Sequence, residues 1–138
     1  MRAHYDMILQ RLSGMTVGGV PVPAFLGDPP SSVVPPYVFV TPRPSVGVAI
    51  STSGADTVLS EGFQVTVVHT SANNTLALQE KVGALLDGYT PAIGGWGTFP
   101  LRAVDAQPVR TDTTVVYGPS NLYPRFAVVS YHLQAVKE

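Results

Sequence analysis

The sequence predicts an α+β fold, a two-layer sandwich in which an antiparallel-rich or mixed sheet carries two helices on one face. Three segments support this prediction. Residues 62–69 alternate between apolar and polar side chains, the pattern of a strand that is covered on one face. Residues 78–89 repeat apolar side chains at helical spacing, and residues 129–135 alternate again. With 138 residues, the chain is expected to form one domain, residues 1–138.

A first helix is predicted over residues 2–13, and Gly14 follows its last turn. Its apolar side chains share one face: Tyr5, Ile8, Leu9 and Leu12. Residues 20–26 form a candidate short strand, which Pro21 and Pro23 restrict to a sheet edge because proline donates no hydrogen bond to a neighbouring strand.

The next strand is predicted over residues 37–41, after a Pro-rich approach that ends in Pro35-Pro36. From residue 42 to residue 61 the chain is rich in small and hydroxyl side chains, which predicts an extended arm or a long hairpin. Three apolar residues alternate within this segment: Val46, Val48 and Ile50.

The strand over residues 62–69 leads through the polar stretch Ser71-Ala72-Asn73 into the second helix. We expect the side-chain oxygens of this stretch, Asn73 included, to cap the helix. The apolar stripe of the helix consists of Leu78, Val82, Leu85, Leu86 and Tyr89. Gly88 suits a left-handed residue that stops the helix.

Gly94-Gly95-Trp96-Gly97 is predicted to be a flexible connector that carries the only tryptophan of the chain. Trp96 is either an anchor for a partner, since aromatic residues are enriched at interface centres, or a plug that folds back on the core. A further strand is predicted over residues 101–109. The last strand directs four side chains to the core: Val129, Tyr131, Leu133 and Ala135.

The chain carries few charges for its size. Only 12% of its residues are Asp, Glu, Lys or Arg, whereas 45% are hydrophobic, and the formal net charge is −1. Interspersed charge and a net charge away from zero keep proteins apart in solution, so we expect much of this surface to contact other protein. No apolar run is long enough to cross a membrane, no export signal is recognised at the N-terminus, and cysteine is absent.

Catalytic patterns are missing from the sequence. It contains no Gly-x-Ser-x-Gly turn, no phosphate-binding Gly-rich loop and no metal-ligand spacing around its three histidines, which are His4, His69 and His132. The histidines fall on different predicted elements, so a structural or solvent-facing role is expected for each. No residue is therefore predicted to be catalytic, to bind a cofactor or to hold a metal, and we expect a protein without enzyme activity.

The order and spacing of these elements resemble the tail-terminator and tail-completion proteins of long-tailed bacteriophages. The resemblance lies in residues 35–40, in the strand at residues 63–67 with the helix that follows it, and in the C-terminal strand from Tyr123 to Val136. It covers most of the chain and concerns pattern rather than a chemical signature.

This resemblance implies a small virion subunit without an active site. Such subunits assemble, typically as a hexameric ring, on the last ring of the tail tube. The ring stops polymerisation of the tube protein and presents a surface to the neck or connector protein of the capsid. The resemblance also implies assembly in the host cytoplasm, no contact with a membrane, and a lumen through which genomic DNA passes without sequence-specific binding; a nearly neutral chain suits such a passage.

Interfaces with neighbouring subunits or with the tail tube are expected at the sheet edges, at the 42–61 arm and at the tryptophan connector. The residues that we predict for these contacts are Arg43, Val46, Val48, Ile50, Glu61, Trp96 and Phe99.

Three other functions are compatible with the sequence. The chain could be a different neck component, a head-tail connector or stopper. It could instead be a small binding module whose aromatic side chains, Trp96, Tyr117 and Tyr123, form a platform for a carbohydrate or a peptide. An enzyme is a third class, which clustering of a histidine and an acid in a closed cleft would favour.

Overall fold

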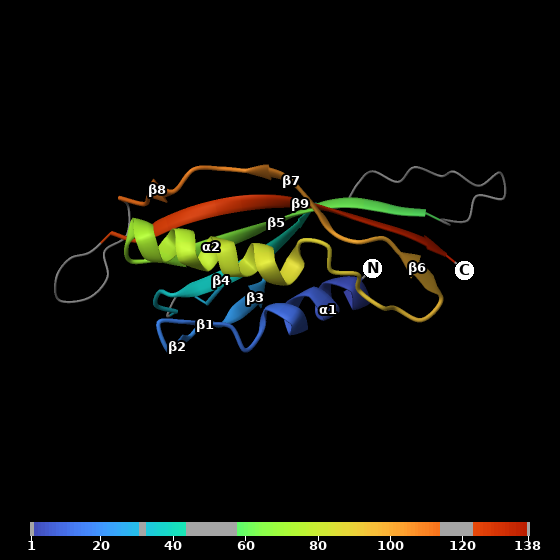
Figure 1. The fold of residues 1–138 in the computed structure, drawn as a ribbon, viewed down its shortest axis with the longest axis horizontal. Helices are drawn as coiled ribbons and strands as arrows, with labels where there is room; N and C mark the ends of the chain where they lie inside the picture. The colour runs from blue at the N-terminus through green and yellow to red at the C-terminus, as the bar shows by residue number, and fades with distance from the viewer. Residues whose placement is uncertain (1, 31–32, 44–57, 114–122, 138) are drawn as a thin grey trace.

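A computed structural model gives the fold and describes residues 2–30, 33–43, 58–113 and 123–137 (Figure 1). The elements follow one another as α1 (Arg2–Leu12), β1 (Thr16–Val17), β2 (Val20–Pro21), β3 (Ala24–Leu26), β4 (Tyr37–Arg43), β5 (Val58–His69), α2 (Ala72–Leu86), β6 (Trp96–Thr98), β7 (Arg102–Ala106), β8 (Arg110–Thr111) and β9 (Arg125–Lys137).

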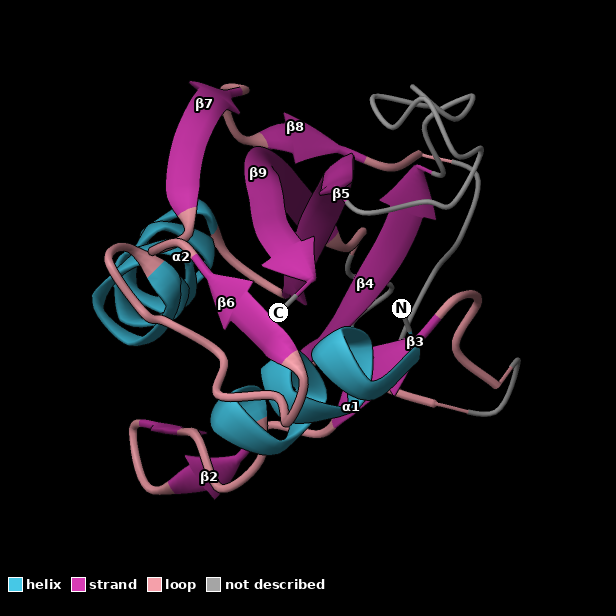
Figure 2. Ribbon diagram, turned by 90° about the vertical axis from the view of Figure 1, so that its right-hand side faces the viewer, coloured by secondary structure: helices cyan, strands magenta, loops and turns pink. Residues whose placement is uncertain are grey.

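The main sheet has the strand order β3-β4-β5-β9-β6, and β7 and β8 also pair with β9. The short strands β6, β7 and β8 therefore follow one another along the same edge of β9. Strands β3 and β4 are parallel, and the other pairs of this sheet are antiparallel. Helices α1 and α2 lie together on one side of the sheet (Figure 2). The structure thus confirms the predicted α+β fold, with a mixed sheet and two helices on one face.

The core lies between the helices and this side of the sheet, which we call the helix face. Alternation places Val38 and Val40 of β4 on the helix face, opposite Val67 and Val65 of β5. From β9, all four predicted side chains are buried there: Val129, Tyr131, Leu133 and Ala135. The helices contribute fully buried side chains at their predicted apolar positions: Ile8, Leu12, Leu78, Val82 and Leu86. Each such side chain stabilises the fold by about 1.5–3 kcal/mol through burial.

Helix α2 begins at a cap that differs in part from the predicted one. The Ser71 backbone is extended, and its Oγ accepts a hydrogen bond of 3.2 Å from the backbone N–H of Asn74. The residue that immediately precedes a helix is the one whose side-chain oxygen typically accepts from this N–H group. Asn73 is one residue too late for this, and it lies exposed in the first turn, so its predicted capping role was wrong. At the other end, Gly88 adopts a φ of 78° and donates from its backbone N–H to Leu101 O, as a left-handed stop does.

Two predicted strands are divided in the structure. Residues 20–26 contribute to two sheets, because the N–H of Val22 donates to Met15 while the carbonyl of Pro23 accepts from Val38. Residues 101–109 contain only the five-residue strand β7, and its side chains are all exposed. Strands β4 and β5 are longer than predicted, so residues 42–43 and 58–61 of the proposed arm are strand. Residues 44–57 of that arm lie outside the described part of the chain.

Neither of the described helices is both long and apolar enough to cross a membrane.

Candidate interaction surface

The face of the sheet opposite the helices carries a groove between its three long strands. No described helix covers this side, which we call the open face (Figure 2). Strand alternation points every second side chain of β4, β5 and β9 to it. The register aligns these side chains in rows that run across the strands, and two of the rows line the groove. The first row is Tyr37, Val68 and Phe126, and the second is Phe39, Thr66 and Val128.

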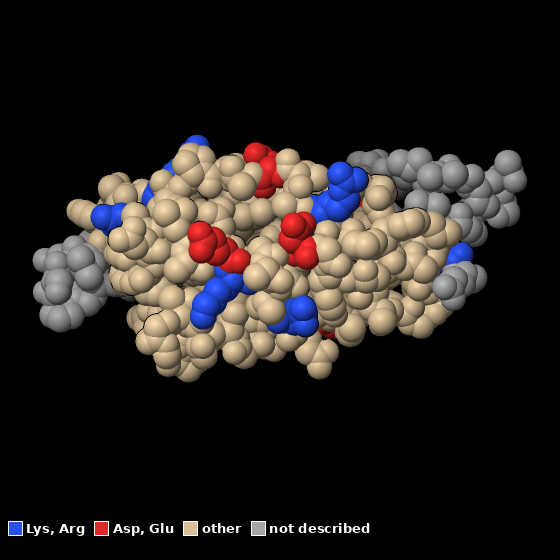
Figure 3. Space-filling model, in the orientation of Figure 1, with Lys and Arg blue, Asp and Glu red and all other residues tan. Residues whose placement is uncertain are grey.

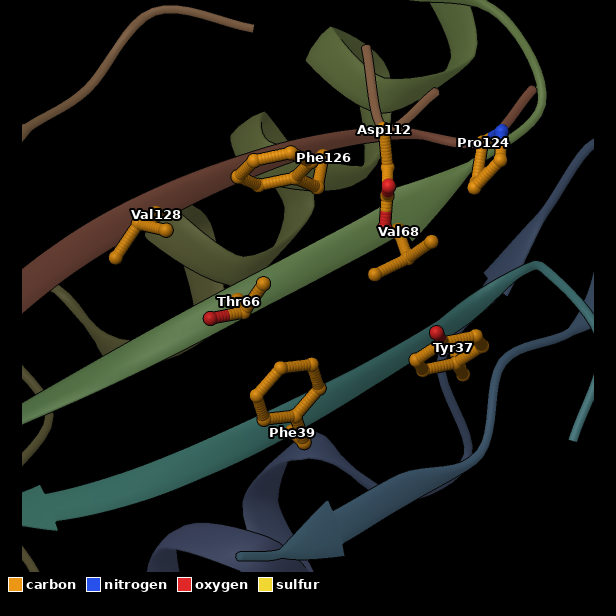
Figure 4. Close-up of a pocket in the computed structure, with 8 residues that line it drawn as sticks. All are labelled: Tyr37, Phe39, Thr66, Val68, Asp112, Pro124, Phe126 and Val128. Carbon is orange, nitrogen blue, oxygen red and sulfur yellow. The ribbon is translucent and has the colours of Figure 1, made fainter. Parts of the chain in front are cut away.

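These six side chains line a groove with a volume of about 340 Å³, and Asp112 and Pro124 complete its wall. Figure 4 shows the six side chains along the three strands, with Asp112 and Pro124 near one end. The backbone N–H of Asp112 donates to the carbonyl of Pro124, which fixes these two segments to each other. The rings of Tyr37 and Phe39 are nearly parallel, with centroids 6.3 Å apart. The groove is therefore an aromatic and aliphatic surface held on paired strands, with a carboxylate at its margin.

The open face becomes polar beyond the groove. The next row across the strands is Thr41, Gln64 and Ser130, and the row after it is Arg43, Gly62 and His132. Ser60 Oγ and His132 Nε2 lie 2.9 Å apart and share a hydrogen bond. The apolar groove thus occupies one part of this face, and polar rows lie beside it, which β7 extends with Arg102 opposite His132 and Asp105 opposite Ser130.

On the helix side of the sheet, two charged side chains connect neighbouring segments of the fold. Arg11 of α1 donates from Nε to the carbonyl of Leu85 at 3.0 Å, and its guanidinium lies 4.9 Å from the centre of the Tyr89 ring. The ammonium group of Lys81 donates to the carbonyl of Thr16. Figure 3 shows separate groups of Lys, Arg, Asp and Glu with wide uncharged areas between them. The low charge content of the sequence is therefore visible as uncharged surface.

Glu61 requires a correction to the predicted interface. Its side chain is only 2% exposed, and its carboxylate accepts a hydrogen bond of 2.8 Å from the hydroxyl of Tyr5. Burial, then this hydrogen bond and the nearby carboxylate, raise the pKa of Tyr5 well above its ordinary value. Glu61 therefore joins β5 to α1 inside the fold and is not a surface group that is available to a partner.

Trp96 lies half-buried on β6 and packs against the core, as the plug interpretation expects. Its ring meets the ring of the fully buried His4 edge to face, with centroids 5.6 Å apart and an interplanar angle of 83°. The flanking Gly94-Gly95 turn does not carry the ring away from the protein.

Two other predicted interface residues do lie at the surface. Arg43 is exposed at the end of β4, and Phe99, which follows β6, is 52% exposed. Val46, Val48 and Ile50 lie outside the described residues.

The predicted aromatic platform is not formed. Trp96 pairs with Lys137 at one end of β9, whereas Tyr123 precedes Arg125 at the other end. Since a strand rises by about 3.3 Å per residue, these two aromatic side chains lie roughly 40 Å apart along β9. Tyr117 falls outside the described residues. The structure therefore separates residues that the binding-module reading needs together.

Within the described ranges, no group of three or more His, Asp or Glu side chains is placed to hold a metal ion. His4, His69 and His132 lie on α1, at the end of β5 and on β9, as the sequence predicted. His4 and His69 have pKa values below the ordinary range because burial disfavours their charged forms.

The groove residues were not among the predicted interface residues. A signal for them was present in residues 37–40, where Tyr37 and Phe39 alternate with Val38 and Val40, so both sides of that strand are apolar. A strand that is apolar on both sides is typical of one buried on both faces. Only one side of this sheet carries described helices, so the second apolar side lines the groove instead of packing against a helix.

Known proteins resemble this chain in fold rather than in sequence. No family model matches it, and no curated protein matches it. Its structure is similar to that of a chain in a solved structure described as "Virion of native gene transfer agent (GTA) particle", with a TM-score of 0.59 and 17% sequence identity. The match covers 92% of this chain and 91% of that chain. The two chains thus share a fold over almost their whole lengths.

Proposed function

We propose that this protein is a structural component of a phage-like virion, and that it forms the ring that ends the tail tube. The fold likeness to a chain of a gene transfer agent virion carries this proposal, because it extends over 92% of one chain and 91% of the other. The helices and strands occur in the order and spacing that suggested a tail terminator, which supports the finer assignment.

The surface supports a protein that works in an assembly. A groove of about 340 Å³ lies on the open face and is lined mainly by aromatic and aliphatic side chains. Interface centres are typically depleted in charge and rich in aromatic residues. The groove has this composition, whereas Arg43 and the other polar side chains of the open face suit the rim of a contact.

We assign the groove to contacts between copies of this chain. A ring is built from one repeated head-to-tail contact, so each copy would place its groove against a second, different surface of its neighbour. A formal net charge of −1 also places little electrostatic repulsion between identical subunits. Phe99 and Arg43 are the described residues of the original prediction that could extend such a contact.

In this role the ring would contact the tail tube protein on one side and a neck or connector protein on the other, in the tail-neck region of the virion. Genomic DNA would pass through the lumen without sequence-specific binding, which a nearly neutral subunit favours because few phosphates would be held by Lys or Arg. The proposal assigns no catalytic step to this chain.

Deletion of the coding gene in a strain that produces the particles tests the proposal. Tail lengths are measured by negative-stain electron microscopy, and the intact gene supplied in trans is the control. A tail terminator predicts tubes of irregular, excessive length without heads, and complementation should restore uniform tails joined to heads.

The other outcomes separate the competing roles. Tails of normal length that fail to join filled heads would replace the terminator role with that of a connector or stopper. Normal, infectious or transducing particles that lack the protein would reject a structural virion role altogether.

A further inference from the structure

The buried histidine of α1 lacks the hydrogen bonds that its side chain normally makes. His4 is 0% exposed, and among the described residues neither Nδ1 nor Nε2 has a hydrogen-bond partner. Within the described part of the chain, the other buried side-chain polar atom without a partner is Thr98 Oγ1, which lies on β6 two residues beyond Trp96. His4 contacts the Trp96 ring edge to face at 5.6 Å. A titratable ring is thus held between a helix and a short edge strand.

We infer that the contact between His4 and Trp96 is an acid-sensitive latch that holds the first turn of α1 against β6 and opens when His4 is protonated. The inference concerns the chain itself and is independent of the virion role.

The latch depends on the cost of burying an imidazolium ion. Both ring nitrogens of the charged form are donors, so protonation would leave two buried N–H groups and a positive charge without an acceptor. Burial, and to a smaller extent the positive charge of the chain's N-terminus, lower the pKa of His4. Release of the turn into water removes this penalty, so acid favours the open state.

The charged groups of the surrounding elements do not offset this cost. Strand β6 carries only Trp96, Gly97 and Thr98, and β3 only Ala24, Phe25 and Leu26, none of which can ionise. On β5, the carboxylate of Glu61 already accepts from Tyr5. Among the side chains that the structure describes, the remaining Asp, Glu, Lys and Arg residues on α1, α2 and the end of β9 are exposed: Asp6, Arg11, Glu80, Lys81, Asp87 and Lys137.

Opening is confined to the start of α1. Ile8 and Leu12 are fully buried one and two turns further along the helix, and they anchor it to the core. Strand β6 is three residues long and pairs with the last residues of β9, so it can lose the histidine contact without disturbing the long β5–β9 pair. The moving parts are therefore small, and the rest of the fold remains closed.

The sign of the pH dependence follows from linkage. The closed state binds the His4 proton less well than the open state, whose histidine titrates near its ordinary pKa of about 6.5. The closed state is therefore fully favoured above this value. As the pH falls below it, the opening equilibrium rises by up to about tenfold per pH unit, until the lowered pKa of the closed state is reached.

The only tryptophan of the chain reports directly on the latch, since its ring contacts the ring of His4. Emission of the wild-type protein is followed from about pH 8 to about pH 5, a range that brackets the ordinary histidine pKa. In parallel, NMR follows the titration of the His4 ring and the protection factors of backbone amides in the first turn of α1, corrected for intrinsic exchange. We expect His4 to titrate below 6.5, with a red shift of the emission and a loss of protection in the same pH range.

Matched variants separate the latch from general acid effects. His4→Phe keeps a ring against Trp96 but cannot be protonated, so it should abolish the emission change. His69→Gln, which removes another histidine of lowered pKa, should retain it. A His4 that titrates at or above 6.5 would overturn the inference, and so would an emission change that persists in His4→Phe. Should His4→Phe fail to fold, the His4 titration and amide protection of the wild-type chain still decide the question.

Discussion

The hydroxyl of Tyr5 donates a 2.8 Å hydrogen bond to the carboxylate of Glu61 and so joins α1 to β5 across 56 positions of the sequence. The Tyr5 ring also meets Phe63 edge to face, with centroids 5.9 Å apart. Phe63 in turn stacks on Tyr131 of β9 at 5.5 Å and an angle of 15°. A polar contact and three aromatic rings therefore connect the first helix to both central strands of the sheet.

Removal of the Tyr5 hydroxyl should destabilise the fold. Tyr5→Phe keeps the ring and leaves the buried carboxylate of Glu61 without this donor, so we expect a loss of about 1–3 kcal/mol in the free energy of unfolding. Urea denaturation followed by circular dichroism measures it. Tyr123→Phe is the matched control, because Tyr123 is 41% exposed, and its effect should stay within about 0.5 kcal/mol. A Tyr5→Phe variant as stable as this control would show that the buried bond contributes little.

Alkaline pH should unfold the protein through its buried tyrosines. Burial first, and then the negative charge of Asp87, raise the pKa of Tyr131 to about 12. A tyrosine in the unfolded chain loses its hydroxyl proton near pH 10. Tyr131 therefore binds this proton more tightly in the folded state than in the unfolded state. Stability is therefore fully present below about pH 10 and declines as the pH rises toward 12.

Absorbance of tyrosinate near 295 nm, recorded together with circular dichroism, measures this effect. Part of the tyrosinate signal should develop only as the fold is lost, and Tyr131→Phe should reduce that late part. Complete ionisation of all tyrosines near pH 10 in a protein that remains folded would contradict the expected shift.

The sequence predicted those parts of the fold whose signal is local. Leu78, Val82 and Leu86 repeat within one helix, and the alternation of β9 is contained in a single run of residues, so periodicity alone reveals their buried sides. Periodicity does not predict the burial of Glu61. Its burial depends on a hydroxyl 56 positions away, and no pattern around residue 61 contains that information.

The groove was missed for a related reason. Phe39, Thr66 and Val128 become neighbours only through the register of three strands, which tertiary pairing sets. The division of residues 20–26 between two sheets likewise follows from hydrogen bonds to the distant residues Met15 and Val38.

The start of α2 offers a local test of stability. Ser71→Ala removes the oxygen that accepts from the Asn74 N–H, and we expect a loss of about 1 kcal/mol in the free energy of unfolding. Ser71→Asp retains an acceptor and should recover most of this loss. Asn73→Ala, placed in the exposed first turn, should change stability by less than about 0.5 kcal/mol or raise it slightly, since alanine favours helix. Thermal unfolding ranks the stabilities of the three variants. A larger loss of stability in Asn73→Ala than in Ser71→Ala would restore the predicted capping role of Asn73.

The groove should be required for contacts between copies of the chain. Phe39→Ser removes an aromatic side chain from the second row of the groove while Val38 and Val40 on the helix face stay unchanged. A central interface residue commonly contributes 2 kcal/mol or more to binding, so we expect the self-association constant to fall by about 30-fold. Analytical ultracentrifugation of the assembled rings measures this change. Val104→Ser on β7 is the matched control, because Val104 is 64% exposed and lies outside the groove, and it should leave association unchanged.

Circular dichroism shows whether each variant is folded. If folded Phe39→Ser assembles as well as Val104→Ser does, the subunits join through another surface, and the sheet edge at β3 becomes the next region to test, since β3 pairs on one side only within the described strands.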